Sequence, residues 1–187
     1  MDKNKGYGIL TVPNLLSLFR LGLIGVFYRV YSVGNRPLWG CGVLILSGLT
    51  DILDGYIARR YNMVSDLGKI LDPLADKLTQ AVTLLCLARR FHAMLLPLGI
   101  MFVKELLGGV LFFMAIKKSG TIQSSHWHGK LNTVLLYAML MLHLVWTDIP
   151  PFLSAVSIAF SVGMMLLSAV LYAMGNLNQL KERRNMP

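Results

Sequence analysis

The feature that most constrains this chain is a run of six apolar blocks, each close to the length of a membrane-spanning helix and separated by short polar stretches. A helix of about 20 residues rises about 30 Å, which is the thickness of the hydrocarbon core of a bilayer. Soluble domains rarely repeat such blocks, and here 55% of the residues are hydrophobic while only 14% are charged. We therefore expect an all-α polytopic membrane protein with six transmembrane helices, forming one membrane domain over residues 1–187.

Polar or turn-forming stretches between the blocks place the boundaries of the spans. The stretches "SVGNRP", "RRYNMVSDLG" and "KKSGTIQSSHWHG" each interrupt an apolar run. The predicted spans are residues 13–33, 38–60, 69–91, 93–116, 129–147 and 151–175. The leader "MDKNKGYGIL" precedes them, and its amphipathic character predicts a segment that lies on the membrane surface.

The net charge of +9 indicates the orientation of the chain in a membrane rather than a nucleic-acid partner. The Lys and Arg residues lie at block ends, without a basic stripe interleaved with aromatic residues, so nucleic acid is not expected. Most of them fall on the side that holds both termini and the 60–68 loop, and the richer side faces the cytoplasm. Arg89 and Arg90 form the one cluster that does not fit this distribution.

Aspartates gather within residues 49–78, in a region that otherwise has the composition of a membrane segment. Asp51 and Asp54 are three residues apart and Asp72 and Asp76 are four apart, so each pair occupies one face of its helix. Two antiparallel helices joined by a short loop would turn these four carboxylates toward each other. We expect this acidic site near the cytoplasmic surface.

Small residues and one arginine accompany the acids. Gly55 and Ala58 continue the face of the first pair, Arg59 follows, and Gly68 stands one turn before Asp72. The missing side chains leave space for a ligand, and a guanidinium fork suits phosphate oxygens. Converging carboxylates need cations, and hard oxygen ligands favour Mg²⁺ or Mn²⁺ over zinc. The pattern predicts two divalent ions and a phosphorylated ligand, while an ion path in a transporter stays open as the alternative.

The chain resembles a known family through one signature, in which every fixed position is present. The signature is that of the CDP-alcohol phosphatidyltransferase family, and it reads here Asp51-x-x-Asp54-Gly55-x-x-Ala58-Arg59, eight residues, then Gly68-x-x-x-Asp72-x-x-x-Asp76. The resemblance extends over nearly the whole chain and implies six transmembrane helices, with the signature in the second and third. It implies transfer of a phosphatidyl group from CDP-diacylglycerol to a polyol phosphate, foremost glycerol 3-phosphate, with release of CMP at the cytoplasmic face of the cell membrane.

The resemblance also implies roles for single residues. Asp51, Asp54, Asp72 and Asp76 would hold two Mg²⁺ or Mn²⁺ ions, and Asp76 would also be the base that takes the proton of the acceptor hydroxyl. The positions that would contact the CDP-lipid are Asn14, Ser17, Gly55, Ala58, Arg59, Ser65 and Gly68. The oligomeric state stays open, with a homodimer as one option.

The acceptor site is less sharply defined than the metal site. The class of the family that uses glycerol 3-phosphate needs cations for the acceptor phosphate, and the candidates here are Arg20, Lys104 and Lys130. An intramembrane lysine is costly without a partner, which Glu105 could supply. Asn132 stands where that class more often has a lysine, and in this it resembles cardiolipin synthases, whose acceptor is phosphatidylglycerol. Both acceptors therefore stay open.

Overall fold

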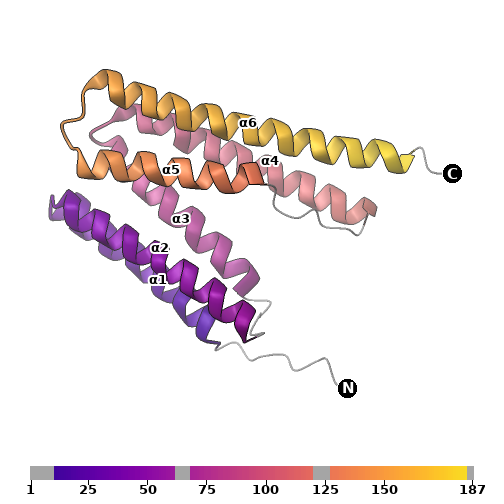
Figure 1. Cartoon of the computed structure of the whole chain (residues 1–187), viewed down its shortest axis with the longest axis horizontal. Helices are drawn as coiled ribbons and strands as arrows, with labels where there is room; N and C mark the ends of the chain where they lie inside the picture. Colours follow the sequence, from indigo (N-terminus) through magenta and orange to yellow (C-terminus); the bar gives the residue numbers. More distant parts are fainter. Residues whose placement is uncertain (1–10, 62–67, 120–126, 185–187) are drawn as a thin grey trace. The chain divides into compact units, whose positions relative to one another are not determined.

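The computed structural model describes residues 11–61, 68–119 and 127–184, and within these ranges all regular secondary structure is helical (Figure 1). The helices are α1 (Val12–Tyr28), α2 (Pro37–Arg60), α3 (Gly68–Ala88), α4 (Leu95–Ser119), α5 (Trp127–Val145) and α6 (Pro151–Arg184). A π-helical turn, Arg29–Val33, follows α1, and a 3-10 turn, His92–Met94, precedes α4. The leader that we expected on the membrane surface lies outside the described residues.

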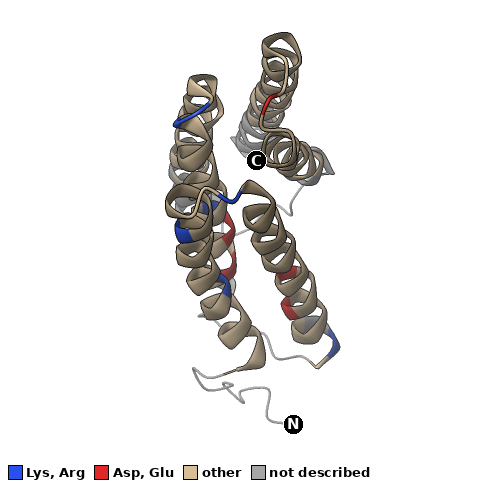
Figure 2. Ribbon diagram, turned by 90° about the vertical axis from the view of Figure 1, so that its left-hand side faces the viewer, with Lys and Arg blue, Asp and Glu red and all other residues tan. Residues whose placement is uncertain are grey.

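This architecture confirms the predicted all-α membrane fold. Among the described residues, four stretches are long and apolar enough to cross a bilayer, namely Val12–Val33, Pro37–Ala58, His92–Gly109 and Pro151–Leu171. α5 adds a shorter apolar stretch, Leu131–Val145, whereas α3 carries acids in its first half. Most of each described helix is tan in Figure 2, that is, without charged residues. Large apolar side chains such as Phe152, which is 75% exposed, provide a surface for lipid.

The structure divides into two units, and each is described here by itself. The first comprises residues 1–90 and 144–147, and the second comprises residues 91–143 and 148–187. The single domain expected over residues 1–187 stays a prediction.

In the first unit α1 is the central helix, because α2 and α3 both pack against it. Thr11 caps its start: the Thr11 Oγ1 accepts a hydrogen bond from the backbone N–H of Asn14 at 3.4 Å. Further along, Phe27 of α1 is 1% exposed, and Leu44 of α2 and Leu84 of α3 are equally well buried. The apolar core of this unit therefore holds the three helices together beyond the acidic region.

A tight turn joins α1 to α2. The chain first widens into the π-helical turn, and a Cβ on Gly34 would stand only 2.8 Å from the Val30 carbonyl oxygen, so glycine is required there. Asn35 then adopts a φ of 48°, a left-handed conformation that asparagine tolerates better than most residues. Pro37 opens α2 with a backbone angle already suited to the first helical turn.

In the second unit α4 packs against α6, and a buried histidine links α5 to the start of α6. The His143 Nδ1 lies 2.8 Å from the carbonyl oxygen of Met139, which can only accept, so this nitrogen carries the proton. The Ser154 hydroxyl therefore donates to the His143 Nε2, at 2.9 Å. The Phe91 ring stands edge-on to the imidazole with centroids 4.9 Å apart. His143 is thus fully used in holding this unit together.

Candidate active site

Arg20 of α1 lies at the centre of the acidic region. Its side chain is 2% exposed, and its Nη1 lies 2.6 Å from Oδ1 of Asp51. Its Nη2 forms a second ion pair, with Asp54, whose side chain is 3% exposed. Asp51 differs in being 53% exposed. One buried guanidinium therefore pairs with both acids of α2, which leaves one negative charge uncompensated when both are ionised, and Asp51 stays accessible from outside.

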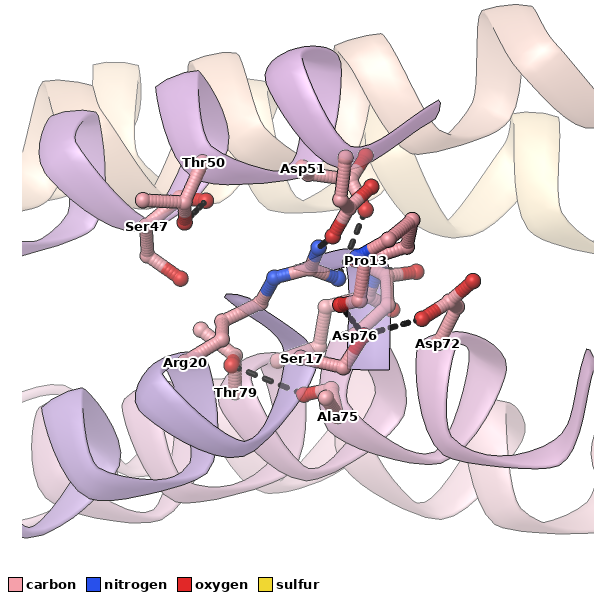
Figure 3. A network of polar contacts seen from close by, with 12 residues as sticks. Pro13, Ser17, Arg20, Ser47, Thr50, Asp51, Asp72, Ala75, Asp76 and Thr79 are labelled. Atoms are coloured by element: carbon pink, nitrogen blue, oxygen red, sulfur yellow. Dashed lines mark hydrogen bonds and ion pairs between the residues drawn. The ribbon is translucent and has the colours of Figure 1, made fainter. Parts of the chain in front are cut away.

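Ser17, one turn earlier on α1, connects this helix to the acids of α3. Its buried hydroxyl contacts Oδ1 of Asp72 and lies 3.0 Å from the Pro13 carbonyl oxygen. Figure 3 shows Ser17 and Arg20 reaching from α1 toward Asp72 and Asp51. The two acid pairs thus meet beside α1, which packs against both α2 and α3.

Gln80 is a member of this site that the sequence reasoning missed. Its Nε2 donates a hydrogen bond to Oδ2 of Asp76 at 2.9 Å, and its side chain is 1% exposed. The available signal was spacing, because Gln80 lies four residues after Asp76 and so shares its face of α3. A buried amide that donates to one carboxylate oxygen restrains the orientation of the Asp76 side chain.

The acids fit divalent ions by their chemistry. All four are hard carboxylate donors, with neither Cys nor His among them, and the Arg20 guanidinium already stands in for a cation between two of them. In the described part of the chain, no three His, Cys, Asp or Glu side chains are close enough to enclose one ion. The acids are therefore assembled in one region while Arg20 and Ser17 hold three of them.

Most of the other predicted site residues belong to the first unit, one belongs to the second, and the side chains of three are not described. Asn14, 2% exposed, lies in the first turn of α1, and Gly68 is buried where α3 begins. Gly55 and Ala58 are half-buried on α2, beyond Asp54. Lys104 is partly buried in the second unit. The side chains of Arg59, Ser65 and Lys130 lie outside the described residues.

A comparison with family models settles what the acidic signature belongs to. The model described as CDP-alcohol phosphatidyltransferase matches residues 10–174, which include every helix of the first unit and the acids of α2 and α3. The chain belongs to the CDP-alcohol phosphatidyltransferase family. The resemblance found in the signature is thereby confirmed over most of the chain.

The similar proteins of known name carry two different enzyme names. A protein of Blochmanniella floridana is 33% identical over 107 residues, and one of Rickettsia bellii is 35% identical over 111 residues. Both are named CDP-diacylglycerol–glycerol-3-phosphate 3-phosphatidyltransferase. A Mycobacterium tuberculosis protein provisionally named cardiolipin synthase is 47% identical over 70 residues.

These alignments cover only part of each protein. The first two cover 55% and 57% of this chain, and 56% and 61% of the relatives' own lengths. The third covers 37% of this chain and 34% of the relative. The first two relatives are thus similar to little more than half of this chain, and the third is similar to about a third of it.

Proposed function

We propose that this protein transfers a phosphatidyl group from CDP-diacylglycerol to glycerol 3-phosphate and releases CMP. The observation that carries the proposal is the gathering of the signature acids of α2 and α3 beside Ser17 and Arg20 of α1. Family membership and the names of the Blochmanniella and Rickettsia relatives support the same reaction. The site would lie at the cytoplasmic ends of the helices, where a lipid donor and a water-soluble acceptor can both reach it.

Asp51, Asp54, Asp72 and Asp76 would hold two divalent ions, Mg²⁺ or Mn²⁺. When bound, such ions neutralise the charge of a pyrophosphate and of a departing phosphate group. In the described structure Arg20 occupies the space between Asp51 and Asp54. Its Nε is buried without a hydrogen-bond partner among the described residues, so it retains a donor for a substrate oxygen.

The chain's own residues then account for the proton transfer and the positioning. Asp76 takes the proton from the acceptor hydroxyl while that oxygen forms a bond to the phosphatidyl phosphorus. The bond from this phosphorus to the CMP oxygen breaks, and CMP leaves. Gln80 restrains the Asp76 side chain through its 2.9 Å hydrogen bond, which orients the carboxylate for its role as the base. No Ser or Cys nucleophile is required, and no covalent intermediate is expected.

Phosphatidylglycerol is the second candidate acceptor, which would make the protein a cardiolipin synthase. Asn132 favours phosphatidylglycerol, because it stands where a lysine would bind the phosphate of glycerol 3-phosphate. Its side chain is 4% exposed, and its Oδ1 has no hydrogen-bond partner in the described part of the chain. The mycobacterial relative supports the same reading. Family membership disfavours the cation transporter. The homodimer stays a prediction.

An acceptor panel tests the proposal. Purified protein with CDP-diacylglycerol and Mg²⁺ is given glycerol 3-phosphate, phosphatidylglycerol or no acceptor, and CMP release is followed. We expect release with glycerol 3-phosphate, abolished by EDTA and restored by added Mg²⁺. Asp76→Asn should stop turnover while CDP-diacylglycerol still binds. Activity with phosphatidylglycerol alone would replace the proposed acceptor, and full activity without divalent ions would refute the metal site.

A further inference from the structure

A polar cavity lies in the first unit, far from the acids. Its volume is about 280 Å³, and its lining includes Tyr31, Ser32, Asn35, Arg89, Arg90 and Thr147. Pro37, at the start of α2, also lines it. The helix rises 1.5 Å per residue, so about 20 Å of α2 separates Pro37 from Asp51. The cavity and the acidic site therefore occupy opposite ends of the same helices.

The charges around the cavity favour an anion. Two arginines line it, and none of its described lining residues is acidic. The guanidinium carbon of Arg89 stands 5.8 Å from the centre of the Tyr28 ring, a cation–π contact that restrains this side chain near the cavity. The N-terminus of α2 adds positive potential, because the 24-residue helix begins at Pro37 and its N-cap residue, Arg36, makes no side-chain capping hydrogen bond.

Two tryptophans place this cavity at the level of lipid headgroups. Trp39 follows Pro37 by two residues and is 68% exposed, and Trp146 precedes Thr147 and is 46% exposed. Exposed indole rings gather where the hydrocarbon core of a membrane meets the headgroups. Leu38, 66% exposed, belongs to the apolar surface beside them. An anion in the cavity would therefore stand where the phosphates of a leaflet lie, with apolar surface available to its acyl chains.

We propose that this cavity binds the phosphodiester headgroup of an anionic phospholipid in the leaflet opposite to the acidic site. The two guanidinium groups match phosphate oxygens, and the hydroxyl and amide groups of the lining can hydrogen-bond a polyol headgroup. The assignment also gives a role to Arg89 and Arg90, the cluster that does not follow the charge distribution of the other loops. It does not depend on which reaction the acids catalyse.

Lipid binding to the purified full chain in detergent tests this assignment, with native mass spectrometry as the readout. Dioleoyl phosphatidylglycerol and dioleoyl phosphatidylcholine are titrated separately, and we expect a clear preference for phosphatidylglycerol. The double variant R89Q/R90Q should bind phosphatidylglycerol roughly tenfold more weakly or worse, because it loses two charge-assisted contacts. R36Q is the matched control: it removes a positive charge at the same end of the unit, from a residue that does not line the cavity, and should change little.

A second variant keeps the test valid if the double variant does not fold. T147F fills the cavity and retains both arginines, so it should weaken phosphatidylglycerol binding to a similar extent. The proposal would be overturned if the wild-type protein bound the two lipids equally. It would also be overturned if folded R89Q/R90Q or T147F bound phosphatidylglycerol as well as the wild type does. Inorganic phosphate serves as competitor: displacement of the lipid at low millimolar phosphate would assign the cavity to free phosphate instead, and persistence of the lipid supports the headgroup.

Discussion

At the scale of single residues, Arg20 decides the charge balance of the acidic site. It is buried and neutralises Asp54, whose side chain is 3% exposed. Arg20→Met would leave that carboxylate without its cation, and unpairing a buried charge costs about 3–5 kcal/mol. We expect a lower melting temperature for R20M in EDTA, partly restored by millimolar Mg²⁺ if the acids bind ions. Thermal unfolding in detergent measures this, with R36M as the exposed control. Equal melting of R20M and R36M would show that Arg20 is dispensable.

Gln80 carries the second prediction at this scale. Gln80→Met removes the hydrogen bond to Asp76 and keeps the side-chain length, so the acid loses its restraint but keeps its carboxylate. A hydrogen bond to a charged group contributes about 1.5–3 kcal/mol, and we expect kcat for CMP release to fall about tenfold to a hundredfold with a smaller change in KM. Thr83→Val is the control, because Thr83 only donates to the Thr79 carbonyl, at 2.7 Å, one turn further along α3. Similar kcat values for Q80M and T83V would argue against a positioning role.

The sequence predicts which side chains share a face of one helix better than it predicts contacts between helices. The acids of α2 and α3 follow from spacing, since side chains three or four residues apart share a helical face. The pairing of Arg20 with Asp51 and Asp54 joins α1 to α2, and no local pattern encodes it. The sequence reasoning therefore assigned Arg20 to the acceptor phosphate, an assignment that stays a prediction.

At the scale of helices, the packing of α1 on α2 depends on one glycine. A Cβ on Gly40 would stand 3.2 Å from the Phe27 ring, whereas a Cβ on Gly42 would meet nothing within 4 Å. Gly40→Val should thus force the buried Phe27 ring aside, and overpacking of this kind costs about 1–3 kcal/mol. We expect G40V to lower the melting temperature and G42V, with the same change in helix propensity, to leave it nearly unchanged. If both variants melt alike, the close approach at Gly40 is not needed for stability.

The extent of the helices was only partly predictable. The Pro37 and Pro151 starts of α2 and α6 follow from the preference of proline for the first helical turn. The predicted sixth membrane span covers residues 151–175, whereas the helix α6 continues to Arg184. Its last part is rich in Leu, Gln, Lys, Glu and Arg, which favour helix without an apolar block. Apolar periodicity finds the membrane portion of such a helix and misses its polar continuation.

At the scale of the whole molecule, the distribution of positive charge predicts which end of α2 faces the cytoplasm. α2 has 24 residues and is therefore about 36 Å long, enough to cross a hydrocarbon core of about 30 Å. Arg36 lies at one end and Tyr61 at the other, and both are exposed. Asp51 and Asp54 lie nearer the Tyr61 end, so the location of Tyr61 reports the side from which the acidic site is reached.

Cysteine labelling in intact cells tests this orientation. Cys41 and Cys86, the two free cysteines, are first replaced by alanine, and Arg36→Cys or Tyr61→Cys is then introduced alone. Because the side richer in Lys and Arg faces the cytoplasm, a membrane-impermeant maleimide should label R36C in intact cells and Y61C only after permeabilisation. The reverse pattern would put the acids on the outer face, away from a cytoplasmic supply of glycerol 3-phosphate, and so would count against the proposed acceptor as well as the orientation. The reverse pattern would also place the arginine-lined cavity in the inner leaflet instead of the outer one.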